Sequence, residues 1–283
     1  MSSLHAHSLP DIPEIEVGAD LAQLIVSAAR AQAQTGAPDR GVSGRGAPGH
    51  DDPGRGAPPL EHAPPFGDGD VIVIAHKAVS KAEGALVVLA GVQPGERALR
   101  LAAEQDRDPR AVQVVLDESQ EILRTERGVL ICRTHHGFVC ANAGVDASNA
   151  PGPDTLIVLP RDPDASARCL RARLRELTAV SPAVLITDSF GRAWRHGQCD
   201  TAIGCAGMCP LEDWRGRADS GGRELQATWL AVADAAAATA DLARAKDSRE
   251  PVVIIKGLER FVTVEDGPGA VALLRPPAED LFL

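Results

Sequence analysis

Tyrosine is absent from the 283-residue chain, and aromatic residues make up only 3% of it. Aliphatic side chains must therefore build the core, and the length allows one large domain or two modest ones. No apolar run approaches transmembrane length. The N-terminus, from Met1 to Pro10, lacks a basic segment followed by an apolar one. We therefore expect no membrane partner and no signal peptide, and the cytoplasm is the expected location.

Positive charge is also scarce in this sequence. The chain has 29 Lys and Arg residues against 39 Asp and Glu residues, which gives a net charge of −10. Proteins that bind nucleic acids present a basic face to the phosphates. Nucleic acid is therefore not expected as the main partner.

None of the six cysteines stands in a C-x-x-C pair. Cys199, Cys205 and Cys209 are clustered, but a zinc site would need a fourth ligand, and His196 is the only candidate nearby. Free and mostly buried thiols are therefore favoured over a metal site.

Several common motifs of catalytic and phosphate-binding sites are missing too. The sequence contains no G-x-x-x-x-G-K-[ST], no G-x-G-x-x-G after a strand, no H-E-x-x-H and no G-x-S-x-G. Apolar runs predict strands at 71–75, 86–89, 129–132, 138–141, 155–159, 183–188 and 252–256. Apolar spacing and caps predict helices at 19–31, at 94–105, from Asp108, from Asp162 and at 224–246.

The tract from 32 to 66 breaks this pattern. It is rich in Gly, Pro, Asp and Arg, and Gly-Arg-Gly-Ala-Pro occurs at 44–48 and again at 54–58. A phosphate-binding loop or a nucleic-acid-binding arm fits poorly, because prolines remove amides and aspartates dilute the arginines. The tract is interpreted as a disordered insertion between an N-terminal part (1–31) and a main domain (67–260), with 261–283 as a tail.

Polar residues alternate with small ones at 142–149, where the chain carries Asn142, Gly144, Asp146, Ser148 and Asn149. Small residues let the backbone approach a ligand, and carboxylate and amide oxygens suit a divalent cation and its phosphates. The alternative is a turn held by its own Asn and Asp side chains.

Asp188 ends the strand predicted at 183–188 and precedes a loop with Gly and Arg residues. A carboxylate at the end of a strand is well placed to hold a metal ion in a cleft, although it could instead cap the turn. Arg192 and Arg195 are candidates for clamping a carboxylate or phosphate.

Lys77 and Lys81 follow the strand at 71–75 and could meet phosphate oxygens, or simply lie on a solvated edge. Two acids for a cation and two lysines for phosphates suggest a magnesium–nucleotide site.

The sequence resembles the family of coenzyme F420-0:L-glutamate ligase, the CofE family, from about residue 69 to 258 and more faintly over Leu9 to Ile25. The similar segments stand in the same order and are Val79–Gly84, Gly137–Asn149, Leu159–Ser166, Ile186–Arg195, Gln198–Pro210 and Asp213–Arg217.

The resemblance implies a GTP-dependent ligase that adds L-glutamate to coenzyme F420-0 through an acyl phosphate, with γ-glutamyl linkages for further residues. It implies Mg²⁺ or Mn²⁺ as cofactor, K⁺ as a possible additional ion, and a mixed α/β (α+β) fold in an intertwined homodimer.

The resemblance also assigns roles to single residues. Asp146 and Asp188 would bind metal, and the Ser189 hydroxyl would contact a second ion. The positions that would contact the nucleotide are Leu9, Pro10, Asp11, Ile12, His76, Lys77, Lys81 and Asn149. Because they lie beside Asp188, Arg192 and Arg195 are the candidates for holding a substrate carboxylate.

Two features depart from the family pattern. One is the insertion at 32–66. The other is Arg244-Ala-Lys-Asp-Ser-Arg249, where relatives usually carry a Met-Gly-[KE]-Gly-like loop, so the third metal ligand is not identified. The alternative functions are a catalytically weakened nucleotide- or deazaflavin-binding protein on the same scaffold, and a GTPase or ATPase of other purpose.

Overall fold

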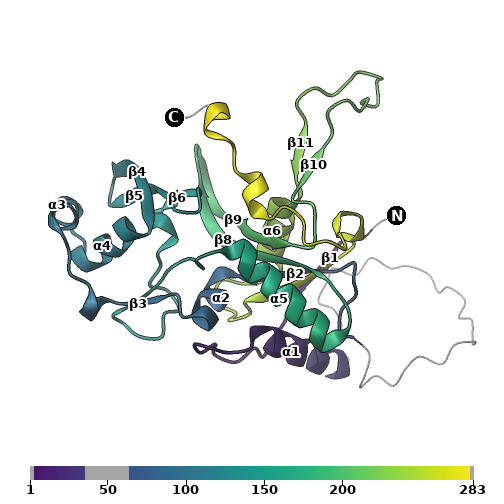
Figure 1. Ribbon diagram of the computed structural model, residues 1–283, viewed down its shortest axis with the longest axis horizontal. Helices are drawn as coiled ribbons and strands as arrows, with labels where there is room; N and C mark the ends of the chain where they lie inside the picture. The colour runs from purple at the N-terminus through teal and green to yellow at the C-terminus, as the bar shows by residue number, and fades with distance from the viewer. Residues whose placement is uncertain (1–2, 36–63, 281–283) are drawn as a thin grey trace, which may run out of the picture.

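The computed structural model describes residues 3–35 and 64–280, and its centre is a five-stranded sheet (Figure 1). The strands β2 and β8 run parallel, and the other neighbours in this sheet are antiparallel. Both ends and the middle of the chain contribute to the sheet. Its order is β1 (His5–Ser8), β12 (Val252–Lys256), β2 (Val71–Ala75), β8 (Ala183–Arg192) and β9 (Arg195–Ala206).

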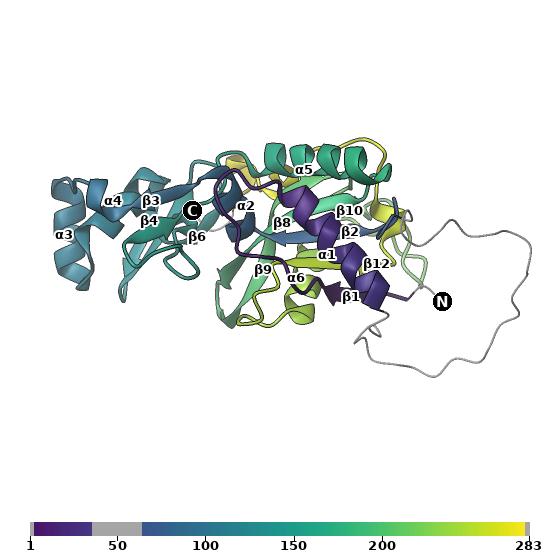
Figure 2. The ribbon, with the colours of Figure 1, turned by 90° about the horizontal axis from the view of Figure 1, so that it is seen from below.

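Helices cover both faces of this sheet, as Figures 1 and 2 show. Because side chains alternate along a strand, Ile72 and Ile74 of β2 pack on one face and Val71 and Val73 on the other. The first face carries α1 (Leu21–Thr35), α2 (His76–Glu83) and α5 (Pro163–Thr178), whereas α6 (Val232–Ala243) covers the second. The core is aliphatic, as the composition predicts.

A smaller lobe stands beside the sheet (Figure 1). Its core combines α3 (Glu96–Gln105) and α4 (Pro109–Asp117) with an antiparallel sheet of β4 (Ser119–Glu126), β5 (Val129–Thr134) and β6 (Val139–Ala141). The chain enters this lobe through β3 (Leu86–Val88) and leaves it through β7 (Thr155–Ile157), and these two strands pair with each other. The mixed α/β fold class is thus confirmed.

A long hairpin formed by β10 (Leu211–Asp213) and β11 (Trp229–Ala231) projects from the molecule (Figure 1). The predicted helix at 224–246 is therefore too long, since α6 begins at Val232. The residues before it pair across the arm, where the Arg215 guanidinium stacks 4.3 Å from the Trp229 ring centre. This cross-strand pairing takes precedence over the local helix propensity of Leu225 to Leu230.

Two predicted boundaries also need correction. The helix α1 continues to Thr35, and Phe66 is 3% exposed in the core, so both ends of the predicted 32–66 insertion are ordered; its residues 36–63 lie outside the described part. The segment called a tail, from 261, is described up to residue 280 and contacts the main domain. The buried Arg171 guanidinium donates to the carbonyl of Thr263 at 2.7 Å, and Ala270 is fully buried.

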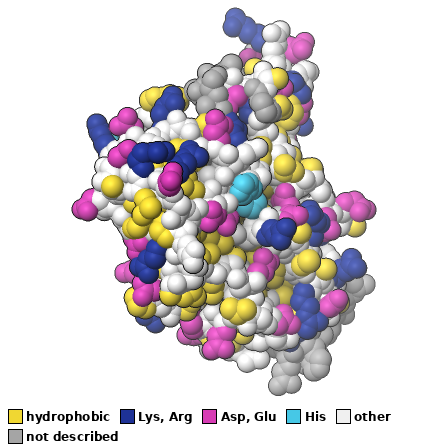
Figure 3. Space-filling model, turned by 60° about the vertical axis from the view of Figure 1, so that its left-hand side comes forward, with side chains coloured by type: hydrophobic (Ala, Val, Ile, Leu, Met, Phe, Trp, Pro, Cys, Tyr) yellow, Lys and Arg dark blue, Asp and Glu magenta, His cyan; other side chains and the backbone are white. Residues whose placement is uncertain are grey.

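No helix within residues 3–35 or 64–280 combines the length and the apolar character needed to span a bilayer. The face in Figure 3 mixes acidic and basic side chains without a continuous basic area.

Candidate active site

The candidate site is built where α2 follows β2 without an intervening loop. Ala75 ends the strand with extended backbone angles, and His76 is already the first helical residue. The N-cap residue Ala75 makes no side-chain cap hydrogen bond, and the free amides of such a helix start are suited to bind an anion. Ala75 pairs with Thr187 of the parallel strand β8, which brings Asp188 to the same edge of the sheet.

His76 connects the start of α2 to Asp188. Its side chain is 2% exposed, and its Nδ1 lies 3.3 Å from Ser80 Oγ. Its Nε2 lies 3.2 Å from Asp188 Oδ1 but has no hydrogen-bond partner among the described residues. The Ser189 amide donates to the same carboxylate oxygen at 2.8 Å. His76 thus contacts Asp188 at the start of α2 without a hydrogen bond between the two side chains.

Lys77, the next residue, connects the same helix start to Asp146. Its ammonium lies 2.5 Å from Asp146 Oδ2 and donates to Ser148 Oγ at 2.5 Å. Asp146 accepts from the Ser148 amide at 2.8 Å and is fixed by two backbone hydrogen bonds to Ile157. Burial raises the pKa of Asp146, but the lysine and Ser148 outweigh it and hold that pKa below its usual range.

Asp146, in the loop before β7, and Asp188, within β8, both contact the start of α2. Their partners Lys77 and His76 are adjacent residues in the first turn of α2. One carboxylate contacts His76 and the other contacts Lys77, so both lie at the helix start, and such groups can bind a cation with its phosphates. The alternative, a turn held by the Asp146 side chain, is also present, because the Ser148 amide donates to the Asp146 carboxylate.

The N-terminal segment that was predicted to contact a nucleotide, Leu9, Pro10, Asp11 and Ile12, leaves the sheet at this same edge. The Leu9 amide donates to Val252 O at 2.9 Å, and Ala75 donates to the adjacent Pro251 O at 2.8 Å. Further on, Glu14 pairs with the Lys81 ammonium, and Lys81 is 8% exposed. Asn149 is exposed, with a φ of 60° that suits asparagine.

A buried aspartate that the sequence analysis missed lies next to this point. Asp200 on β9 faces Ser189 on β8 and is 3% exposed. It accepts from Thr187 Oγ1 at 2.9 Å and from Ser189 Oγ at 2.6 Å, and it pairs with the Arg244 guanidinium. Burial raises the pKa of Asp200, but Arg244 and the hydroxyl donors hold it below its usual range. The only hint in the sequence was that Asp200 stands just before the apolar run that starts at Ala202.

The structure does not bring Arg192 and Arg195 to α2. Both are exposed at the end of the β8–β9 hairpin, where Arg192 donates to His196 O at 2.7 Å. Four residues of strand, about 13 Å, separate Arg192 from Asp188. Their proposed contact with a substrate carboxylate stays a prediction.

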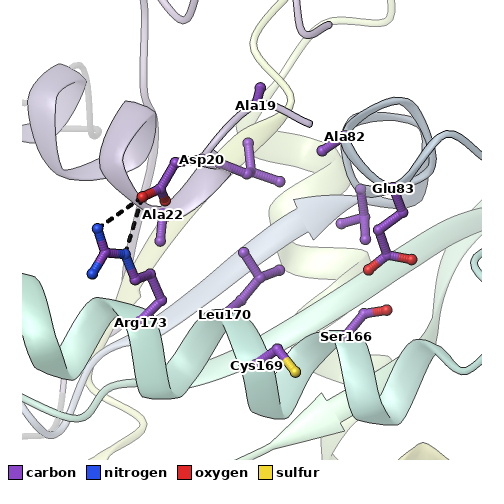
Figure 4. A pocket seen from close by; sticks show the side chains of 11 residues that line it. Ala19, Asp20, Ala22, Ala82, Glu83, Ser166, Cys169, Leu170 and Arg173 are labelled. Atoms are coloured by element: carbon purple, nitrogen blue, oxygen red, sulfur yellow. Dashed lines mark hydrogen bonds and ion pairs between the residues drawn. The ribbon is translucent and has the colours of Figure 1, made fainter. Parts of the chain in front are cut away.

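No group of three or more His, Cys, Asp or Glu side chains suited to a metal occurs within the described residues. All six cysteines are free, but only Cys132, Cys140 and Cys205 are buried, so the expectation of mostly buried thiols holds for half of them. A shallow pocket between α1, α2 and α5 is a different feature: Asp20 and Arg173 pair across one end of it at 3.0 Å (Figure 4). It uses the C-terminal half of α2 and so lies away from the candidate site.

The sequence profile of the F420-0:Gamma-glutamyl ligase family matches residues 59–257. The chain belongs to this family. It is 47% identical to the coenzyme F420:L-glutamate ligase of Methanopyrus kandleri over 217 residues, which cover 76% of this chain and 86% of the relative. The proteins of the same name from Methanothermobacter thermautotrophicus and Methanocaldococcus jannaschii are 44% and 42% identical, over 76% and 77% of this chain and 85% and 86% of the relatives. The resemblance inferred from the motifs is confirmed, and the family is one of ligases.

Proposed function

We propose that this ligase joins L-glutamate to coenzyme F420-0 and uses GTP to drive the reaction. The names of its relatives support the two substrates. The use of a nucleotide is supported by one observation: the adjacent residues His76 and Lys77 contact the carboxylates of Asp188 and Asp146. These contacts support the proposal because they would let one helix start hold a cation together with its phosphates.

The residues present fit a divalent ion of the magnesium type. Mg²⁺ usually binds through one or two protein carboxylates and takes its other ligands from phosphates and water. Asp146 and Asp188 would hold it, and bound Mg²⁺ or Mn²⁺ would supply neutralisation of phosphate charge. Lys77 and Lys81 would add two further positive charges, and the α2 amides would orient the phosphates. K⁺ is proposed as an additional ion.

The chemistry explains why so many positive groups are needed. A carboxylate is a poor electrophile, so its oxygen first takes the γ-phosphoryl group of GTP, releasing GDP and forming an acyl phosphate. The amine of glutamate then attacks the carbonyl carbon, the bond to phosphate breaks, and the nitrogen loses a proton. Both steps gather negative charge, which the lysines and helix amides would stabilise. Further glutamates would be added through γ-glutamyl linkages.

The second candidate, a nucleotide- or deazaflavin-binding protein without turnover, is favoured only by the unusual residues 244–249. Mass spectrometry of coenzyme F420-0 incubated with the protein, GTP, Mg²⁺ and L-glutamate separates the two functions. We expect the mass to increase by one or more glutamyl residues, with GDP formed in equal amount. Binding of GTP without any mass increase would instead identify a binder.

A further inference from the structure

Ser189, which was expected to contact a second divalent ion, is already engaged by side chains of this chain. Its hydroxyl donates to Asp200 Oδ1 at 2.6 Å and accepts from the Lys246 ammonium at 2.8 Å. The same ammonium lies 3.3 Å from Asp200 Oδ1 and 2.5 Å from Asp241 Oδ1. The oxygens that a second ion would use therefore surround a lysine, and the residues do not fit that ion.

The charges at this point are also balanced without an ion. Two carboxylates, Asp200 and Asp241, face two cations, Arg244 and Lys246. A divalent ion bound to the same oxygens would meet the fixed ammonium at close range, and in a partly buried site that repulsion is weakly screened. Binding of such an ion would require Lys246 to leave two carboxylates, Asp200 and Asp241. Lys77 has to give up only one, Asp146, when an ion binds there, and it can pass to a phosphate oxygen.

The loop after α6 places Lys246 firmly. Its first residue, Arg244, is 8% exposed and donates to Pro251 O at 3.0 Å and to Thr187 Oγ1 at 3.1 Å, besides pairing with Asp200. These contacts fix both ends of the loop to the edge of the sheet where α2 begins. The Lys246 side chain is itself 62% exposed, so it remains accessible to a phosphate from the solvent side.

We propose that Lys246 is a tethered positive charge that takes the place of a second divalent ion, so that the active site binds one such ion, at Asp146 and Asp188. This inference rests on the proposed function. Because a lysine ammonium is a compact point charge with three donors, it can contact a phosphate oxygen while keeping its carboxylate partners.

The test counts Mn²⁺ ions bound per chain, in the presence of a non-hydrolysable GTP analogue, by equilibrium dialysis and electron paramagnetic resonance. The wild-type protein should bind one ion per chain and give an uncoupled spectrum. Lys246→Gln removes the ammonium and offers an amide oxygen beside Ser189, Asp200 and Asp241. It should bind two ions per chain and give a spin-coupled spectrum. Lys256→Gln, at the exposed far end of β12, removes an equal charge and should still bind one.

Each other outcome has a definite meaning. Two ions bound to the wild type, or one ion bound to Lys246→Gln, would overturn the role of Lys246 and leave the ligase proposal intact. No ion bound to either protein would contradict the proposed metal–nucleotide site itself. Should Lys246→Gln not fold, Lys246→Met provides the same count, because it also removes the charge and leaves the acceptor oxygens to recruit an ion.

Discussion

Asp146 has two roles at once, since its carboxylate closes a turn with Ser148 and also pairs with Lys77. The Asp146 carboxylate therefore needs no bound metal ion for the chain to fold. The Lys77 ammonium lies against Asp146 and offsets its charge, whereas His76 contacts Asp188 without a hydrogen bond.

Asp146→Asn and Asp188→Asn should each lower turnover by two to four orders of magnitude. This is about 3–5 kcal/mol of transition-state stabilisation, because each change removes one negative charge from the ligands of the metal ion. Folding should survive, with a loss of at most about 1 kcal/mol for Asp146→Asn, whose ion pair with Lys77 is partly exposed. Turnover against Mg²⁺ concentration and metal-free melting temperature check both effects. Asp106→Asn, an exposed position in the smaller lobe, is the matched control. Near-normal turnover at low Mg²⁺ would show that the aspartate is no metal ligand.

Asp200→Asn should be strongly destabilising, by roughly 3 kcal/mol, since it leaves the buried Arg244 guanidinium without its anion. The pKa of Asp200 is lowered in the folded protein, so its contribution to stability is complete above its unfolded pKa, near 3.9, and is lost as the pH falls through the folded value. Urea unfolding at several pH values should therefore show wild type and variant converging below about pH 4. A constant difference down to pH 2 would contradict this linkage.

At the level of elements, the small residues of β9 have a reason inside the subunit. Small residues such as those from Ala202 to Met208 allow close packing within a subunit or between subunits, and here Ala202, Ile203 and Cys205 are buried between α5 and α6 of the same chain. Gly204 lies against α5, where an added Cβ would come 2.3 Å from Pro163 O. The run therefore gives no support for a dimer.

Gly204→Ala should destabilise the protein by about 2–3 kcal/mol, because the new methyl group meets backbone at the start of α5 and forces β9 and α5 apart. Gly91→Ala is the control, since a Cβ there has no described atom within 4 Å and should change stability by less than about 0.5 kcal/mol. Chemical denaturation of both variants measures the difference. Equal stabilities would mean that α5 can shift freely on the sheet.

Sequence patterns predicted the elements that are locally encoded. Asp162 does cap α5, with its carboxylate accepting from the Ala165 amide at 2.9 Å, and β2 and β12 lie where apolar runs placed them. Elements defined by distant partners were missed. The strand β1 is short and mostly polar, and β4 is mostly polar too, so neither is among the strands that apolar runs predict. For the same reason Asp146 and Asp188 could be found from motifs, whereas Asp200 could not.

For the whole molecule, the projecting β10–β11 arm supports the proposal of an intertwined homodimer. Trp229 and Leu230 are 47% and 41% exposed on it, and a two-stranded arm of this kind is marginally stable alone. We expect a dimer at micromolar concentration by sedimentation velocity. Trp229→Ala should weaken it at least tenfold, whereas Leu242→Ala, an exposed position on α6, should not. A wild-type monomer would contradict the proposal.

The cytoplasmic location stays a prediction.

The order of strands in the central sheet has a consequence for synthesis on the ribosome. The strand β12 is translated after the other four strands of this sheet, yet it lies between β1, which precedes them in the sequence, and β2. Until Val252–Lys256 has left the exit tunnel, the first strand has no neighbour in the sheet, and one edge of β2 is open. Such long-range closure is slow, and open edges attract other chains. The smaller lobe, whose contacts are local, can fold earlier. Nascent chains stalled before Val252 should therefore depend on chaperones that cover strand edges.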